Sequence, residues 1–354
     1  MMNPWLGIIV ASLGAVAAQG VCAAAGAPGS SVDLAFVSIR DGDAHIYTHL
    51  GGVDHLLTQG KSVNTQPAWS SDGRIAFTSS RNGVPRIYVM NEDGSGQHRL
   101  TQDDRIELAA SWSPDGKWIA FFSSAIDARG DELRVVEVSS GKPVSITAEV
   151  KDKGSTPPTW SADGSRIAFV GRAEGAKAEV WVVNRDGSVL RNVSAKFAAR
   201  VKAWASISPD GKSVAYVADI RGTQPVVVAD VETGESTVLT SAFPGAYESP
   251  RWSPDGKQLA VASSRDDPAS ARNDIFVINA DGTGLRNLSQ DPGEDFDPQW
   301  SGDGKSVVFS SLRTGTSQLF QVDLDSGKTS RISNNPSHDM DPVLRPVAKR
   351  QLPG

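Results

Sequence analysis

The sequence predicts an all-β fold, a β-propeller in which four-stranded blades form a closed ring. A hexapeptide of the type Trp-Ser-Pro-Asp-Gly-Lys recurs six times along the 354 residues, at intervals of 43 to 48 residues. Each copy is followed by a short apolar run rich in β-branched and aromatic residues. The period is typical of propellers and helical solenoids, whereas short runs of this composition between turn residues are typical of strands. One repeat therefore supplies one blade.

The hexapeptide predicts a tight turn between the first and second strands of each repeat. Its copies begin at Trp69, Trp112, Trp160, Ile207, Trp252 and Trp300. The proline sets φ for the second turn position, the aspartate bonds its own backbone, and the glycine takes a positive φ. We expect the aromatic ring before the turn to be buried between neighbouring blades, where it stabilises the core.

The remainder of each repeat predicts three further strands. In the repeat that begins at Trp252, residues 259–261 belong to the second strand and residues 274–278 to the third. An Asn-x-Asp-Gly segment then predicts the turn into a fourth strand, which ends in a Leu-Thr or similar pair. This segment faintly resembles a calcium loop, but its place in every such repeat favours turn chemistry.

The two ends of the repeat region complement each other. Residues 34–58 contain a second, third and fourth strand without a first, and residues 341–344 match the start of a first strand. We expect these fragments to form one shared blade, closed by the C-terminal strand, because this leaves the ring without a free edge. Seven copies of the second-strand signature favour seven blades. Six blades are the alternative, if the N-terminal fragment packs elsewhere.

Composition and the N-terminus predict where the protein works. The net charge of −6 disfavours nucleic acid as a partner. An apolar run over residues 6–18 and small residues near position 24 predict a secretory signal peptide, and thus a periplasmic or secreted protein with no integral membrane segment after processing. The single cysteine, Cys22, falls in this leader, so no disulfide is expected. The predicted divisions are signal peptide 1–25, flexible linker 26–31, propeller 32–346 and tail 347–354.

The repeat also carries a family resemblance. The pattern Pro-x-Trp-Ser-Pro-Asp-Gly-Lys-x-Ile-Ala-Phe, followed by an Ile-Tyr-Val-type strand and Asn-x-Asp-Gly, resembles the PD40 repeat of the TolB-like propellers. The resemblance covers residues 32 to about 346. It implies a propeller in the cell envelope. TolB itself carries an α/β domain before its propeller, whereas about 30 residues precede the first predicted strand of this chain.

The candidate binding face is the one that carries the variable loops, at the mouth of the central channel. The segments leading into consecutive first strands are acidic there, and two aromatic residues lie among the acids. The candidate ligand-binding residues are Glu248, Asp295, Asp297, Asp339, Asp341, Tyr247 and Phe296. Their summed charge favours a cationic ligand or a basic peptide; solubility combined with Asp-Pro turn chemistry is the alternative.

An arginine also follows the second strand of every repeat at this face. These residues are Arg40, Arg81, Arg129, Arg172, Arg221, Arg265 and Arg313. We expect them to form ion pairs between blades.

The expected function is non-catalytic binding of a protein segment or small ligand by a monomer in the cell envelope, with no cofactor or metal. The alternative is a lyase or hydrolase that acts on an oligosaccharide or peptide, with acid-base groups among the same carboxylates. No Gly-x-Ser-x-Gly nucleophile elbow occurs in the sequence.

Overall fold

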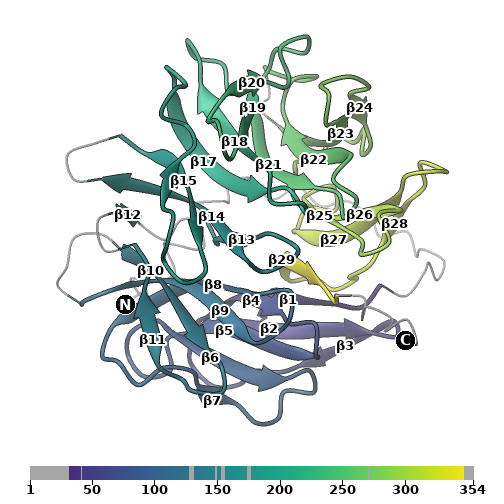
Figure 1. Cartoon of the computed structure of the whole chain (residues 1–354). Helices are drawn as coiled ribbons and strands as arrows, with labels where there is room; N and C mark the ends of the chain where they lie inside the picture. The colour runs from purple at the N-terminus through teal and green to yellow at the C-terminus, as the bar shows by residue number, and fades with distance from the viewer. Residues whose placement is uncertain are drawn as a thin grey trace, which may run out of the picture.

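The computed structural model describes residues 32–40, 42–126, 131–147, 150–152, 156–173, 177–269 and 272–346. The predicted signal peptide, linker and tail lie outside these residues, as does Arg129. The described chain forms 29 β-strands, arranged as blades around a centre (Figure 1). None of its segments is a helix with the length and apolar character needed to cross a membrane.

Seven antiparallel blades contain all of these strands except β12, and each blade runs from an innermost to an outermost strand. In that order, blade 1 contains β29 (His338–Leu344), β1 (Leu34–Arg40), β2 (Asp43–Leu50) and β3 (Val53–Leu56). Blade 2 contains β4 (Asn64–Trp69), β5 (Arg74–Ser79), β6 (Arg86–Asn91) and β7 (His98–Arg99). Blade 3 contains β8 (Ile106–Trp112), β9 (Trp118–Ser124), β10 (Asp131–Glu137) and β11 (Pro143–Ser145).

The other blades follow in chain order. Blade 4 contains β13 (Thr159–Trp160), β14 (Arg166–Ala173), β15 (Glu179–Asn184) and β16 (Arg191–Asn192). Blade 5 contains β17 (Arg200–Ile207), β18 (Ser213–Asp219), β19 (Val226–Asp230) and β20 (Ser236–Val238). Blade 6 contains β21 (Tyr247–Trp252), β22 (Gln258–Ser263), β23 (Asp274–Asn279) and β24 (Arg286–Asn287). Blade 7 contains β25 (Asp295–Trp300), β26 (Ser306–Ser311), β27 (Gln318–Asp323) and β28 (Thr329–Arg331).

One further strand joins two blades. β12 (Val150–Asp152) pairs with β10 of blade 3 and with β14 of blade 4. The two blades therefore form a single nine-stranded sheet, in which β12 bridges the space between them.

The C-terminal strand closes the ring. β29 pairs antiparallel with β1, with Leu344 opposite Leu34 and His338 opposite Ile39, and the yellow β29 lies beside the purple β1 in Figure 1. The innermost strands contact one another in the closed order β29, β4, β8, β13, β17, β21, β25 and back to β29. The predicted seven-bladed ring with a shared first blade is confirmed, and the six-bladed alternative is excluded.

The hydrophobic core is divided among the blade interfaces. Seven apolar clusters are present, each built from two neighbouring blades. In one of them Trp300 packs with Ile275 of blade 6 and Phe309 of blade 7. Its indole N–H also donates to the carbonyl of Arg251, on the preceding inner strand, at 2.9 Å. The tryptophan therefore links neighbouring blades by packing and by a hydrogen bond.

The repeated hexapeptide is a structural turn. In all six copies the serine hydroxyl donates to the aspartate carboxylate two residues later, at 2.5 to 2.7 Å. The glycine that follows has φ between 68° and 90°, which a residue with a Cβ adopts only with strain. In the turn after Trp252, the hydrogen bond from Ser253 lowers the pKa of Asp255. These aspartates hold the turn.

Candidate functional site

The channel-lining strands share an irregularity that determines what faces the channel. In six blades the inner strand has a β-bulge three residues before the tryptophan position, at Gln66, Ala109, Trp204, Ser249, Asp297 and Asp341, with φ between 50° and 62°. The pairing register shifts at the same places. Bulges re-aim side chains and are frequent next to binding sites.

Two of these bulges bring carboxylates from neighbouring blades together. Asp297 of β25 and Asp341 of β29 are both half-buried. Burial and, to a smaller extent, the negative charge of Asp297 together raise the pKa of Asp341 to about 7. Burial also raises the pKa of Asp297, while the positive charge of Arg251 lowers it. The two carboxyl groups therefore compete for one proton near neutral pH.

A third carboxylate belongs to the same group. Glu248 of β21 is half-buried, and its pKa is raised by burial and by the negative charges of Glu294 and Asp297. Glu248, Asp297 and Asp341 thus come from the inner strands of blades 6, 7 and 1. We call these three residues the acidic sector. Among the described residues, no three His, Cys, Asp or Glu side chains form a group arranged to hold a metal ion.

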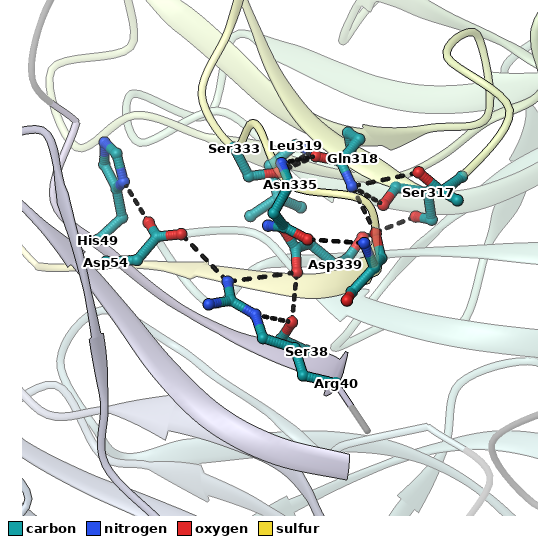
Figure 2. Close-up of polar contacts among 12 residues, drawn as sticks. Ser38, Arg40, His49, Asp54, Ser317, Gln318, Leu319, Ser333, Asn335 and Asp339 are labelled. Carbon is teal, nitrogen blue, oxygen red and sulfur yellow. Dashed lines mark hydrogen bonds and ion pairs between the residues drawn. The ribbon is translucent and has the colours of Figure 1, made fainter. Parts of the chain in front are cut away.

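Two other predicted acids are inside the blades. Asp295 and Asp339 are 0% exposed. Arg313 donates Nη2–H to both carboxylate oxygens of Asp295. Asp339 accepts hydrogen bonds from Ser38 and from Asn335, each at 2.6 Å, and Figure 2 shows it between these side chains. Burial raises the pKa of Asp295 to about 6 although Arg313 lowers it. Both carboxylates therefore form their polar contacts with side chains of the protein.

The two predicted aromatic residues are packed against protein. Tyr247 is 0% exposed, and its hydroxyl donates to the carbonyl of Phe243 at 2.7 Å. Phe296 is half-buried and packs against the apolar cluster between blades 1 and 2. Of the seven candidate residues, Glu248, Asp297 and Asp341 therefore remain as partly exposed acids whose charges influence one another.

The shortest ion pairs of Arg40 and Arg313 lie within a blade, so for these two arginines the expected ion pairs between blades are not the main arrangement. Arg313 and Asp295 both belong to blade 7. Arg40 of blade 1 contacts Asp54 of the same blade at 3.2 Å and lies 4.0 Å from Asp339. The reason is sheet geometry: the second strand ends beside the start of its own inner strand, so these groups are neighbours in one sheet.

Sequence reasoning missed three features. Trp204, at the bulge of β17, is half-buried and has φ of 62°. Arg251, one residue before Trp252, supplies the positive charge beside Asp297. Both residues could have been found from their distance to the tryptophan position of the repeat. That distance places Trp204 at the same point of its repeat as Asp297.

The third missed feature is a cavity on the opposite face. Blade 1 has no turn between its first and second strands, because chain closure replaces it there. A cavity of about 1200 Å³ lies at this seam, between the turn of blade 2 and the turn of blade 7. Asp33, Glu92 and Arg345 are among its lining residues, and Arg345 forms ion pairs with both acids, at 3.3 and 2.6 Å. The cavity is therefore partly filled by its own charge pairs.

Seven four-stranded blades around a channel with charged inner strands define the class of protein as a β-propeller. Residues 14–207 and 205–351 match the PD40 family, described as the TolB beta propeller domain. The chain belongs to this family.

Individual relatives agree with that assignment. The chain is 29% identical over 169 residues to a protein TolB homolog of Chlorobium luteolum, a match that covers 48% of this chain and 36% of that protein. The chain spans half or less of the length of the curated relatives it matches.

Two solved structures show the same fold at lower identity. TolB from Acinetobacter baumannii is 16% identical, with a TM-score of 0.57, over 86% of this chain and 79% of that one. Oligogalacturonate lyase from Vibrio parahaemolyticus is 18% identical, with a TM-score of 0.63, over 84% of this chain and 88% of that one. Proteins with different names and activities thus share this architecture, so function is argued from the site.

Proposed function

We propose that this protein is a non-catalytic, TolB-like propeller of the periplasm that binds a cationic group of a protein segment or small ligand at its acidic sector. The observation that carries the proposal is the grouping of Glu248, Asp297 and Asp341 on three consecutive inner strands, where Asp297 raises the pKa of Asp341. Carboxylates held this close repel one another, and a cation between them relieves the repulsion.

The sector also has the access that such a role needs. Its three residues are half-buried, so part of their surface stays accessible to a ligand, while the surrounding protein reduces screening by water. The sequence of residues 1–25 and the family relationship support a periplasmic address.

The test is a charge-neutral triple variant, E248Q/D297N/D341N, compared with wild type for capture of partners from envelope extract and for calorimetric binding of pentalysine. We expect the variant to lose capture of the partner and at least tenfold in affinity for pentalysine, because about 1.4 kcal/mol of lost attraction is a factor of ten. The matched control, E232Q/E235Q/D325N, removes three exposed acids elsewhere. Equal binding by both triple variants would exclude the acidic sector.

One observation favours a second candidate, a lyase or hydrolase acting on an oligosaccharide or peptide. An Asp341 carboxyl with a pKa of about 7 beside Asp297 has the properties of a general acid-base pair at neutral pH. The test is incubation of purified protein with oligogalacturonides and with peptides, followed by mass spectrometry of the products. Turnover that D341N abolishes would establish the enzyme, and its absence with retained pentalysine binding supports the binding protein.

A further inference from the structure

The mouth arginines of blades 7, 1 and 2 share one internal arrangement. In each blade the arginine Nε–H donates to the serine hydroxyl two residues earlier, at 2.8 Å for Arg313, 3.0 Å for Arg40 and 2.9 Å for Arg81. The guanidinium also lies near a polar side chain of its own inner strand, which is Asp295, Asp339 or Asn64. These arginines are satisfied by their own blades.

Blade 6 has an arginine at the same position, Arg265, but its guanidinium does not have the partners found in the other three blades. The inner-strand position of Asp295 is taken by Tyr247, whose hydroxyl is directed to Phe243. Ser263, two residues before Arg265, donates to the carbonyl of Ala246 at 2.6 Å and accepts from the backbone N–H of Arg265 rather than from its Nε. The Arg265 Nε is buried and has no hydrogen-bond partner among the residues that the structure describes. Its charge contact in the described chain is one long pair, Nη1 to Asp266 at 3.5 Å.

The Arg265 side chain is nevertheless held in place. Its guanidinium lies over the rings of Phe243 and Phe276, with centroid distances of 5.6 and 6.0 Å. A Cβ at Gly245 would lie 2.6 Å from the Arg265 Cβ, so the close packing of this segment requires glycine. The side chain is 27% exposed, which leaves the guanidinium edge open to solvent at the mouth.

A second positive group lies beside this segment. The loop of Arg221 in blade 5 is tied to it through Gln224, whose N–H donates to Gly245 and whose carbonyl accepts from Tyr247, at 3.3 and 2.9 Å. Arg221 is exposed, and no carboxylate of the described residues forms an ion pair with it. The loop that carries Arg221 is thus hydrogen-bonded to the segment that packs against Arg265.

We propose that the channel mouth carries a carboxylate-binding site centred on Arg265, with Arg221 as a second cation. The guanidinium is always charged and offers donors in a planar fork that matches a carboxylate. Blade 7 shows the same interaction made internally, because Arg313 binds the carboxylate of Asp295. In blade 6 the carboxylate of an external ligand binds Arg265 as Asp295 binds Arg313 in blade 7. With the acidic sector, the mouth then fits a ligand that carries both charges, an extension that rests on the proposed function.

The test follows the side-chain Nε–H signals of protein labelled with ¹⁵N-arginine. The probes are N-acetylglycine, which has one carboxylate, and its uncharged amide, N-acetylglycinamide. We expect N-acetylglycine to shift the Arg265 signal saturably and the amide to leave it unchanged. R265Q should weaken N-acetylglycine binding roughly tenfold or more. R286Q, which removes an exposed arginine from the outer strand of the same blade, should bind as wild type does.

Several outcomes would overturn the site. These are an unmoved Arg265 signal, equal binding of the acid and the amide, or equal affinity of R265Q and R286Q. Inorganic phosphate is titrated in parallel, and binding of phosphate without N-acetylglycine would also overturn the assignment to carboxylates. The fold of R265Q is checked by its thermal unfolding. Butylammonium, a cation, reports separately on the acidic sector. If the protein binds butylammonium but not N-acetylglycine, the carboxylate-binding site is contradicted and the proposed function is not. If it binds N-acetylglycine but not butylammonium, the proposed function is contradicted and the carboxylate-binding site is not.

Discussion

Arg313 donates Nη2–H to both carboxylate oxygens of Asp295, at 3.1 and 2.9 Å, and both residues belong to blade 7. The guanidinium also lies 4.6 Å from the ring centroid of Phe320. In the sequence, Arg313 belongs to the set of arginines that follow the second strands, and Asp295 belongs to the set of acids that precede the first strands. In the structure they form one buried pair that holds the second strand of the blade to its inner strand.

Removal of one partner of this pair should be strongly destabilising. D295A removes the nearest carboxylate of Arg313, whose side chain is 12% exposed, and leaves the longer ion pair with Asp291 at 3.7 Å. We expect the free energy of unfolding to fall by about 3 kcal/mol, because the buried guanidinium loses its nearest partner but keeps its desolvation cost. Urea denaturation measures the change. D325A, in an exposed turn, is the control and should change stability by less than about 0.5 kcal/mol; a similar small change in D295A would contradict the buried-pair account.

The raised pKa of Asp341 predicts a pH dependence of stability. Its folded value of about 7 exceeds the reference value of 3.8, so the folded state holds the proton more tightly than the unfolded state. The resulting stabilisation is complete below about pH 4 and is lost as the pH rises to about 7. Other groups titrate in the same range, so the test is the difference between wild type and D341N.

We expect D341N to gain stability relative to wild type across that interval, by roughly 2 kcal/mol between pH 4 and pH 7 after allowance for solvent screening. Denaturation curves at fixed ionic strength measure the difference. D325N serves as the control because its carboxylate is exposed. A constant difference between D341N and wild type at all pH values would show that Asp341 titrates as an ordinary aspartate.

The tryptophans allow a matched test of the hydrogen bonds between blades. Trp300 Nε1 donates to the carbonyl of Arg251, whereas Trp69 Nε1 is buried and finds no hydrogen-bond partner in the described part of the chain. Replacement by phenylalanine removes the N–H in both cases and a similar apolar area. W300F should therefore lose about 1 kcal/mol more than W69F, as measured by chemical denaturation. The two costs would be equal if the hydrogen bond contributed nothing.

Ring closure can be tested with a disulfide between the chain ends. Ala35 and Val343 are opposite each other in the β1 and β29 pairing, so A35C/V343C in a C22S background should oxidise readily. The bond joins residues far apart in sequence, and we expect about 2 to 4 kcal/mol of stabilisation. Non-reducing electrophoresis and thermal unfolding measure it. A35C/K328C, with one cysteine in the loop before an outer strand of blade 7, is the control and should not crosslink.

Much of the fold was predictable because its signals are local and repeated. The turn hexapeptide, the apolar strands and the complementary ends each depend on neighbouring residues, and their recurrence predicted seven blades and the closing strand. The strand β12 was not predicted, because a three-residue strand between blades has no repeat to support it. The seam cavity was missed for a related reason, since it arises where a repeated turn is absent.

The candidate site was only partly predictable. Glu248, Asp297 and Asp341 were named together with Asp295, Asp339 and Tyr247, and nothing in their composition separates those that face the channel from those that are buried. That separation depends on the bulge, which turns Asp297 and Asp341 toward each other while Asp295 and Asp339 are enclosed in their own blades. The partners of the arginines depend likewise on which strands lie side by side.

By itself, the sequence determined the blade, the number of blades and the closure of the ring, because turn and strand preferences act over a few residues and are repeated along the chain. Only the tertiary structure decided which charges are used within the protein and which are left over, because a charge finds its partner across strands that are distant in sequence. Arg313 and Arg265 occupy the same position in their repeats, yet Arg313 binds the buried carboxylate of Asp295, whereas Arg265 has a buried Nε without a hydrogen-bond partner among the described residues.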